Sequence, residues 1–120
     1  LKVDLCRDHL AGHEMVIGRY YESHHYYIAA IGRYQSVVQQ YQTTKHVPEA
    51  LERLVECYLK LGMKTEAMHA GAVLGYNYPG SLWYRDAYAR LHQAGLAVAS
   101  APQPKGTGPG LFGGIWDAIF

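Results

Sequence analysis

Apolar side chains recur at helical spacing between residues 51 and 79, and their sizes follow a fixed order. The order is two large residues, an aromatic residue, a glycine, a small residue, a large residue and a proline. These positions are filled by Leu51, Leu54, Tyr58, Gly62, Ala67, Leu74 and Pro79. The first three share one helix face, Gly62 suits the left-handed residue that ends a helix, and Pro79 ends the next helix. The stretch predicts an antiparallel helical hairpin, which needs neighbouring hairpins to cover its apolar face.

A second copy of this order lies upstream, on a predicted helix over about residues 5–21 and another that begins near Tyr27. Its positions are filled by Ile17, Gly18, Tyr21, Ala30, Tyr34 and Val37. Gly18 corresponds to Val55, so the period is 37 residues, against about 34 in the tetratricopeptide repeat (TPR) that this order matches. The extra residues are expected in the polar segment 42–46.

A last helix is predicted over residues 82–93, capped by Ser81 and closed by Gly95. It is expected to cover the end of the stack with Trp83, Ala87, Tyr88 and Leu91. The predicted fold class is all-α: a TPR helical-hairpin solenoid of about five helices over residues 1–95, with a flexible C-terminal tail.

The tail changes composition twice. Residues 96–110 are rich in Ala, Ser, Pro and Gly and predict a flexible linker. Residues 111–120 would form one apolar stripe if helical, made by Leu111, Phe112, Ile115, Trp116, Ile119 and Phe120. We expect this segment to fold back on the solenoid, to dock in a partner's groove or to lie at a membrane interface.

Charge and apolar content exclude several classes. A net charge of +1 argues against a nucleic-acid binder, and no apolar run is long enough to span a bilayer. The chain shows no signal peptide and begins in the middle of a pattern, so a fragment of a longer protein is expected. Whether Cys6 and Cys57 pair stays open, because pairing depends on a distance that the sequence does not give.

Candidate chemistry is sparse. His9 and His13 are spaced like two metal ligands on a helix and are followed by Glu14, but Ile17 stands where the HExxH pattern needs its second histidine. A metal-dependent enzyme using these residues is kept only as a third hypothesis. No catalytic residue, metal or cofactor is predicted.

Charged residues of the organising hairpin are the predicted interaction surface. We expect Glu49, Glu52, Arg53, Glu56 and Lys60 to point into the concave groove with which TPR arrays hold partners. The alternative is a merely solvated face, and Glu49–Arg53 and Glu56–Lys60 are favourable i,i+4 pairs. Arg33 and Gln35, on the preceding helix, are expected to face the other side.

The longer motifs resemble one family closely. CRDHLAGHE, GRYYESHHYYIAAIGRYQSVVQQYQTT, PEALERLVECYLKLGMKTEA and AVLGYNYPGSLWYRDAYARL, over residues 1–92, resemble the C-terminal half of the BamD family of outer-membrane assembly lipoproteins. The resemblance implies a non-enzymatic scaffold subunit of the β-barrel assembly machinery, at the periplasmic face of the outer membrane. It also implies that the C-terminal repeats dock on a POTRA domain of the central subunit BamA, with Arg33 at the family's BamA-facing arginine.

Other implications of the resemblance concern parts outside this chain. In that family the N-terminal repeats engage unfolded outer-membrane proteins, and a lipidated cysteine anchors the protein to the membrane. Neither Cys6 nor Cys57 follows a lipobox, so no anchor is expected in this chain. Our interpretation is therefore a docking scaffold, and the alternative is a generic TPR adaptor that captures peptides in its groove.

Overall fold

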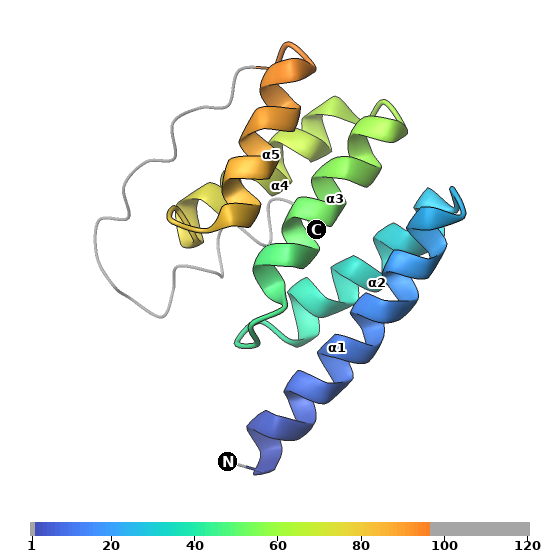
Figure 1. Cartoon of the computed structure of the whole chain (residues 1–120), viewed down its shortest axis with the longest axis vertical. Helices are drawn as coiled ribbons and strands as arrows, with labels where there is room; N and C mark the ends of the chain where they lie inside the picture. The colour runs from blue at the N-terminus through green and yellow to red at the C-terminus, as the bar shows by residue number, and fades with distance from the viewer. Residues whose placement is uncertain (1, 97–120) are drawn as a thin grey trace.

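The described part of the chain, residues 2–96 of this computed structural model, folds into five helices and no strand. They are α1 (Lys2–Ser23), α2 (Tyr27–Gln40), α3 (Val47–Lys60), α4 (Lys64–Asn77) and α5 (Leu82–Gln93) (Figure 1). The all-α class is confirmed. The apolar tail segment of Leu111, Phe112, Ile115, Trp116, Ile119 and Phe120 lies outside the described residues, as does the predicted linker beyond Leu96.

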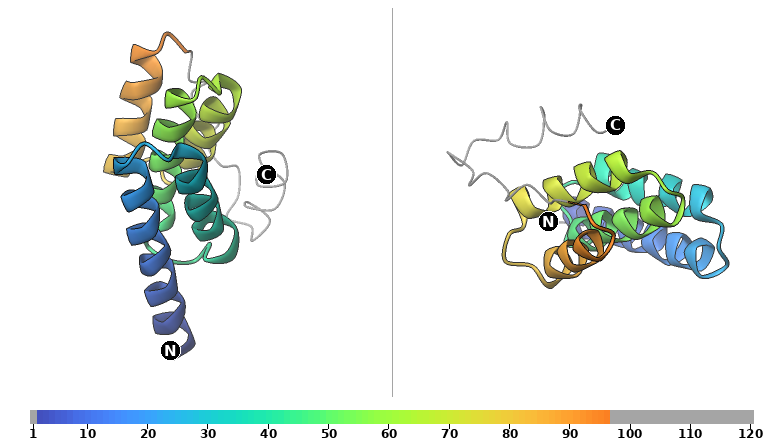
Figure 2. Two further views of the ribbon diagram at one scale, coloured as in Figure 1. Left: turned by 90° about the vertical axis from the view of Figure 1, so that its right-hand side faces the viewer. Right: turned by 90° about the horizontal axis from the view of Figure 1, so that it is seen from above.

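The helices stack as two hairpins and a closing helix. α1 packs on α2 and α3 on α4, α2 joins the hairpins by packing on α3, and α5 covers both α3 and α4. Figure 2 shows the same order from two further sides. This is the TPR-type solenoid expected from the repeat pattern, with α5 in the place of a further first helix.

Local sequence sets the helix ends. Gly62 and Gly95 both have a φ of +76°, the left-handed conformation that glycine adopts without strain after a helix. Ser81 accepts a hydrogen bond at 3.0 Å from the backbone N–H of Tyr84 and so caps α5. His25, with φ 64°, supplies the left-handed residue between α1 and α2.

In each hairpin a larger residue on one helix faces a glycine on the other. The helix that carries the glycine differs between the two hairpins. In the first hairpin the ring of fully buried Tyr34 crosses Gly18, where an added Cβ would lie only 2.6 Å from it. The equivalent positions 37 residues later are Gly71 and Val55, so the glycine has moved to the second helix. A Cβ at Gly71 would lie 2.5 Å from the side chain of Leu91, and this gap admits α5.

The inner face of α5 is narrower than predicted. Ala87 and Leu91 are fully buried and Trp83 packs against the core, but Tyr88 is 47% exposed. The Tyr88 ring instead lies 6.3 Å from Tyr84 and 6.2 Å from His92, centroid to centroid, along α5 itself. The prediction for Tyr88 was wrong because a short closing helix buries only a thin stripe. No helix within residues 2–96 is both long and apolar enough to cross a membrane.

Candidate functional site

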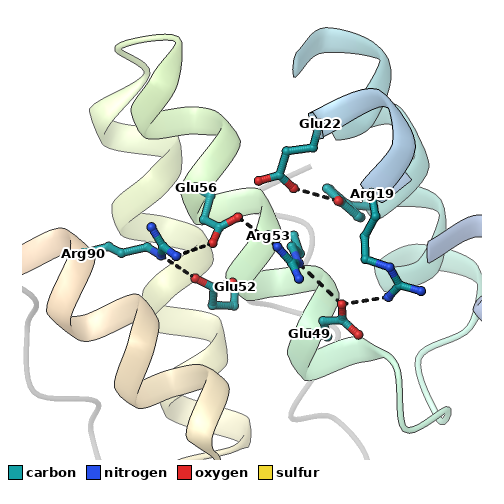
Figure 3. Close-up of polar contacts among 8 residues, drawn as sticks. Arg19, Glu22, Glu49, Glu52, Arg53, Glu56 and Arg90 are labelled. Carbon is teal, nitrogen blue, oxygen red and sulfur yellow. Dashed lines mark hydrogen bonds and ion pairs between the residues drawn. The ribbon is translucent and has the colours of Figure 1, made fainter. Parts of the chain in front are cut away.

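Charged side chains from three helices meet on one face of the solenoid. α3 presents Glu49, Glu52, Arg53 and Glu56 between α1 and α5, because these residues lie three or four positions apart. α1 adds Arg19 and Glu22, and α5 adds Arg90 (Figure 3). We call these seven residues the charge network.

The network is continuous across the face. Arg19 Nη1 lies 2.8 Å from Glu49 Oε2, which Arg53 Nε also contacts at 3.4 Å. Arg53 Nη1 then reaches Glu56 Oε2 at 3.4 Å. Arg90 closes the row, with Nη2 at 2.6 Å from Glu56 Oε1 and Nε at 2.8 Å from Glu52 Oε1. The contacts of Arg19 and Arg90, at 2.6–2.8 Å, are short charge-assisted bonds of the stronger kind, so these two arginines tie α1 and α5 to α3.

Two predicted groove residues behave differently from expectation. Glu52 does not point into open solvent: its side chain is 2% exposed and Arg90 covers it. Lys60 does not pair with Glu56, because Glu56 is occupied by Arg53 and Arg90. Lys60 is exposed and has no acidic partner within residues 2–96. The Glu49–Arg53 pair forms as predicted.

Burial makes two of the carboxyl groups hard to ionise. Glu22 accepts a hydrogen bond at 2.7 Å from the Tyr34 hydroxyl, yet burial and the neighbouring Glu56 raise the pKa of Glu22 from 4.5 to about 7. Burial, together with the charge of Glu56, likewise raises the pKa of Glu52 to about 7. Burial also acts to raise the pKa of Glu56, but Glu22 as a hydrogen-bond donor and the charges of Arg90 and Arg53 outweigh it and lower this pKa.

Two cavities flank the network and together form what we call the inner groove. One has a volume of about 480 Å³ and lies toward α5, lined by Glu22, Glu56, Leu59, Lys60, Arg90, Gln93 and Ala94. The other has a volume of about 420 Å³ and lies toward the α1–α2 turn, lined by Arg19, Glu22, Ser23, His25, Tyr27, Arg53 and Lys60. Glu22 and Lys60 line both cavities, so the two are adjacent.

Arg33 lies apart from the inner groove. Its Nη1 contacts both carboxylate oxygens of Glu14, at 3.3 and 3.2 Å, and its side chain is 42% exposed. Nη2 and Nε have no acceptor among residues 2–96. Contrary to the prediction, Gln35 does not face outward with Arg33. It turns to α3 and donates at 2.8 Å to the Tyr58 hydroxyl.

The metal hypothesis receives no support from the geometry. Within residues 2–96, no group of three or more His, Cys, Asp or Glu side chains could hold a metal ion. His9 and His13 line a surface hollow with Asp8 and His46. Cys6 is exposed and Cys57 buried, and both are free thiols. Burial, with the charges of Glu22 and Glu56, raises the pKa of Cys57.

Sequence reasoning missed Arg19, Glu22 and Arg90, although they complete the network. One signal was present: Arg90 follows Arg53 by 37 residues, the repeat period. The positions of Arg19 and Glu22 depend on how α1 lies against α3, which no spacing within one helix reveals.

Stacked helical hairpins with a charged inner groove define a helical-repeat protein. A family model described as YfiO, outer membrane lipoprotein, matches residues 1–74. The chain belongs to this family, as its motifs predicted. The family description confirms the predicted association with the outer membrane.

Curated relatives agree with this family. The chain is 53% identical over 106 residues to the outer membrane protein assembly factor BamD of Caulobacter vibrioides. This match covers 88% of the chain and 35% of the relative. It is 56% identical over 88 residues to BamD of Rickettsia prowazekii, and the match covers 73% of this chain and 35% of that relative. It is 42% identical over 74 residues to BamD of Neisseria meningitidis, and the match covers 62% of this chain and 28% of that relative. The chain thus spans about a third of its relatives' length, and no solved structure matches it.

Proposed function

We propose that this chain is the docking part of a non-catalytic scaffold subunit that assembles β-barrel proteins, at the periplasmic face of the outer membrane. Its support is membership in a family of outer membrane lipoproteins and similarity to proteins named as outer membrane protein assembly factors. Engagement of unfolded barrel proteins and lipid anchoring would fall to the parts of the relatives that this chain does not span.

The partner we propose is a POTRA domain of BamA, bound through the surface around Arg33. Three features support this choice. The Arg33 side chain is 42% exposed, two of its three nitrogens have no acceptor within residues 2–96, and its contacts with Glu14 are longer than the about 2.8 Å of a strong charge-assisted bond. A carboxylate of a partner could therefore accept two parallel bonds from the guanidinium at little cost.

Calorimetric titration of the isolated POTRA region of BamA tests this proposal. We expect saturable binding that Arg33→Ala and Arg33→Lys both weaken at least tenfold, because lysine cannot copy a bidentate contact. Arg85→Ala, an exposed arginine on α5, is the matched control and should bind like wild type. A chain ending at Gly95 shows whether the apolar tail contributes. Absence of binding by well-folded protein would refute docking through this part of the molecule.

A generic adaptor that captures peptides in the inner groove is the second candidate, because two adjacent cavities lie beside Arg53 and Lys60. In that case substitution of Arg53 should weaken partner binding and substitution of Arg33 should not. Adding Arg53→Ala to the same titration therefore separates the two functions.

A further inference from the structure

We propose that the inner groove is a second interaction site, distinct from the Arg33 surface, which binds an extended polypeptide segment that carries carboxylate side chains. This inference rests on the second candidate function above, peptide capture in the inner groove, and adds the chemistry of the captured segment; it does not depend on docking on a POTRA domain. It rests on the different depths of the network's charges, on Lys60, which has no acidic partner within residues 2–96, and on the shape of the two cavities.

The carboxylates of the charge network are more deeply buried than its cations. The exposed fractions are 2% for Glu52, 10% for Glu56 and 15% for Glu49. The arginines are more accessible, at 28% for Arg53. Arg19 and Arg90 reach 40% and 49%. A ligand that enters from solvent therefore meets guanidinium groups first.

Two carboxylates of the charge network are also incompletely ionised near neutral pH. Burial raises the pKa of Glu22 and of Glu52 to about 7, so each is only partly ionised there. The two cavities are lined by two glutamates, Glu22 and Glu56, and by four basic residues, Arg19, Arg53, Lys60 and Arg90. The groove therefore carries a positive excess.

Lys60 marks the centre of this excess. It lines both cavities, is exposed, and has no acidic partner within residues 2–96. Each arginine of the network contacts at least one glutamate, whereas Lys60 contacts none among the described residues. A carboxylate placed between Lys60 and Arg90 would complete the row of alternating charges.

The shape of the groove favours a polypeptide over a lipid surface. Its cavities hold about 480 and 420 Å³, room for a few side chains in each. Polar side chains for backbone contacts lie along it, Gln93 toward α5 and His25 toward the α1–α2 turn, and Leu59 and Tyr27 add apolar surface. A recess of this kind admits a chain, whereas a flat bilayer would touch only the rim.

The test uses the 120-residue chain and three fluorescein-labelled ten-residue probes, in which alanine alternates with Glu, Gln or Lys. Fluorescence anisotropy measures binding to wild type, to Lys60→Glu and to Lys64→Glu. Lys64, at the start of α4, is the matched control, because it is exposed and lines neither cavity. Circular dichroism confirms that each variant is folded.

We expect the Glu–Ala probe to bind most tightly. Lys60→Glu should weaken it at least fivefold and Lys64→Glu by less than twofold, and added salt should weaken it for wild type. Equal binding of the Gln–Ala probe, equal effects of the two substitutions, or no binding at millimolar protein would overturn the proposal. Binding to phosphatidylglycerol vesicles that Lys60→Glu abolishes, with no binding of the Glu–Ala probe, would assign the groove to a membrane instead.

Discussion

Gly18→Ala tests the packing that joins the first hairpin. The new Cβ would lie 2.6 Å from Cε1 and 2.9 Å from Cδ1 of Tyr34, closer than van der Waals contact allows. The ring has little freedom to move, because Tyr34 is fully buried and its hydroxyl donates to Glu22 at 2.7 Å. Overpacking of this kind lowers the free energy of unfolding by about 1–3 kcal/mol. The higher helix propensity of alanine raises it by about 1 kcal/mol. We expect a net loss of up to about 2 kcal/mol.

Gly32→Ala is the matched control. Gly32 also lies inside a helix, but a Cβ there would meet nothing within 4 Å, so only the propensity gain of up to about 1 kcal/mol applies. Urea denaturation followed by circular dichroism at 222 nm gives both values. Opposite signs for the two variants are expected. Stabilisation by Gly18→Ala, or destabilisation by both substitutions to the same extent, would refute the interlocking of Gly18 with Tyr34.

Three further predictions concern the helix interfaces. Arg90→Ala should destabilise the chain by about 2 kcal/mol in urea denaturation, because Glu52 and Glu56 both lose their ion-pair partner on α5; an unchanged midpoint would show that these pairs do not hold α5. The thermal midpoint should fall as pH rises from about 5 to 8, because the folded state keeps protons on Glu22 and Glu52 that the unfolded chain has already lost; Glu52→Gln should flatten this slope, and a midpoint that rises over the range would contradict the raised pKa values. Tyr58→Ala should cost on the order of 3 kcal/mol, since the ring is buried between helices; a loss below about 1 kcal/mol would argue against its packing.

Features that reside in one helix were predictable from the sequence. The last helix spans Leu82–Gln93 with its cap at Ser81, as expected, and Gly62 and Gly95 take the left-handed conformation. Such signals work because a cap or a stop depends on neighbouring residues alone. The 37-residue period is equally visible in the sequence, because both hairpins need apolar residues at corresponding positions of their helices.

Features that arise between helices were not predictable in the same way. Glu52 looked like a solvated residue by spacing, but Arg90, distant in the chain, covers it. The predicted Glu56–Lys60 pair gave way to two arginines, one of them from α5, because cross-helix partners compete with i,i+4 partners. The reversal of large and small residues between the hairpins likewise appears only when Leu91 is seen against Gly71.

The most direct measurement compares the two surfaces in one calorimetric series. The POTRA region of BamA is titrated into wild type, Arg33→Ala and Lys60→Glu under identical conditions. Docking through the Arg33 surface predicts at least tenfold weaker binding for Arg33→Ala and less than a twofold change for Lys60→Glu. The reverse pattern, with Lys60→Glu weak and Arg33→Ala unchanged, would contradict the docking role and make the inner groove the principal binding site.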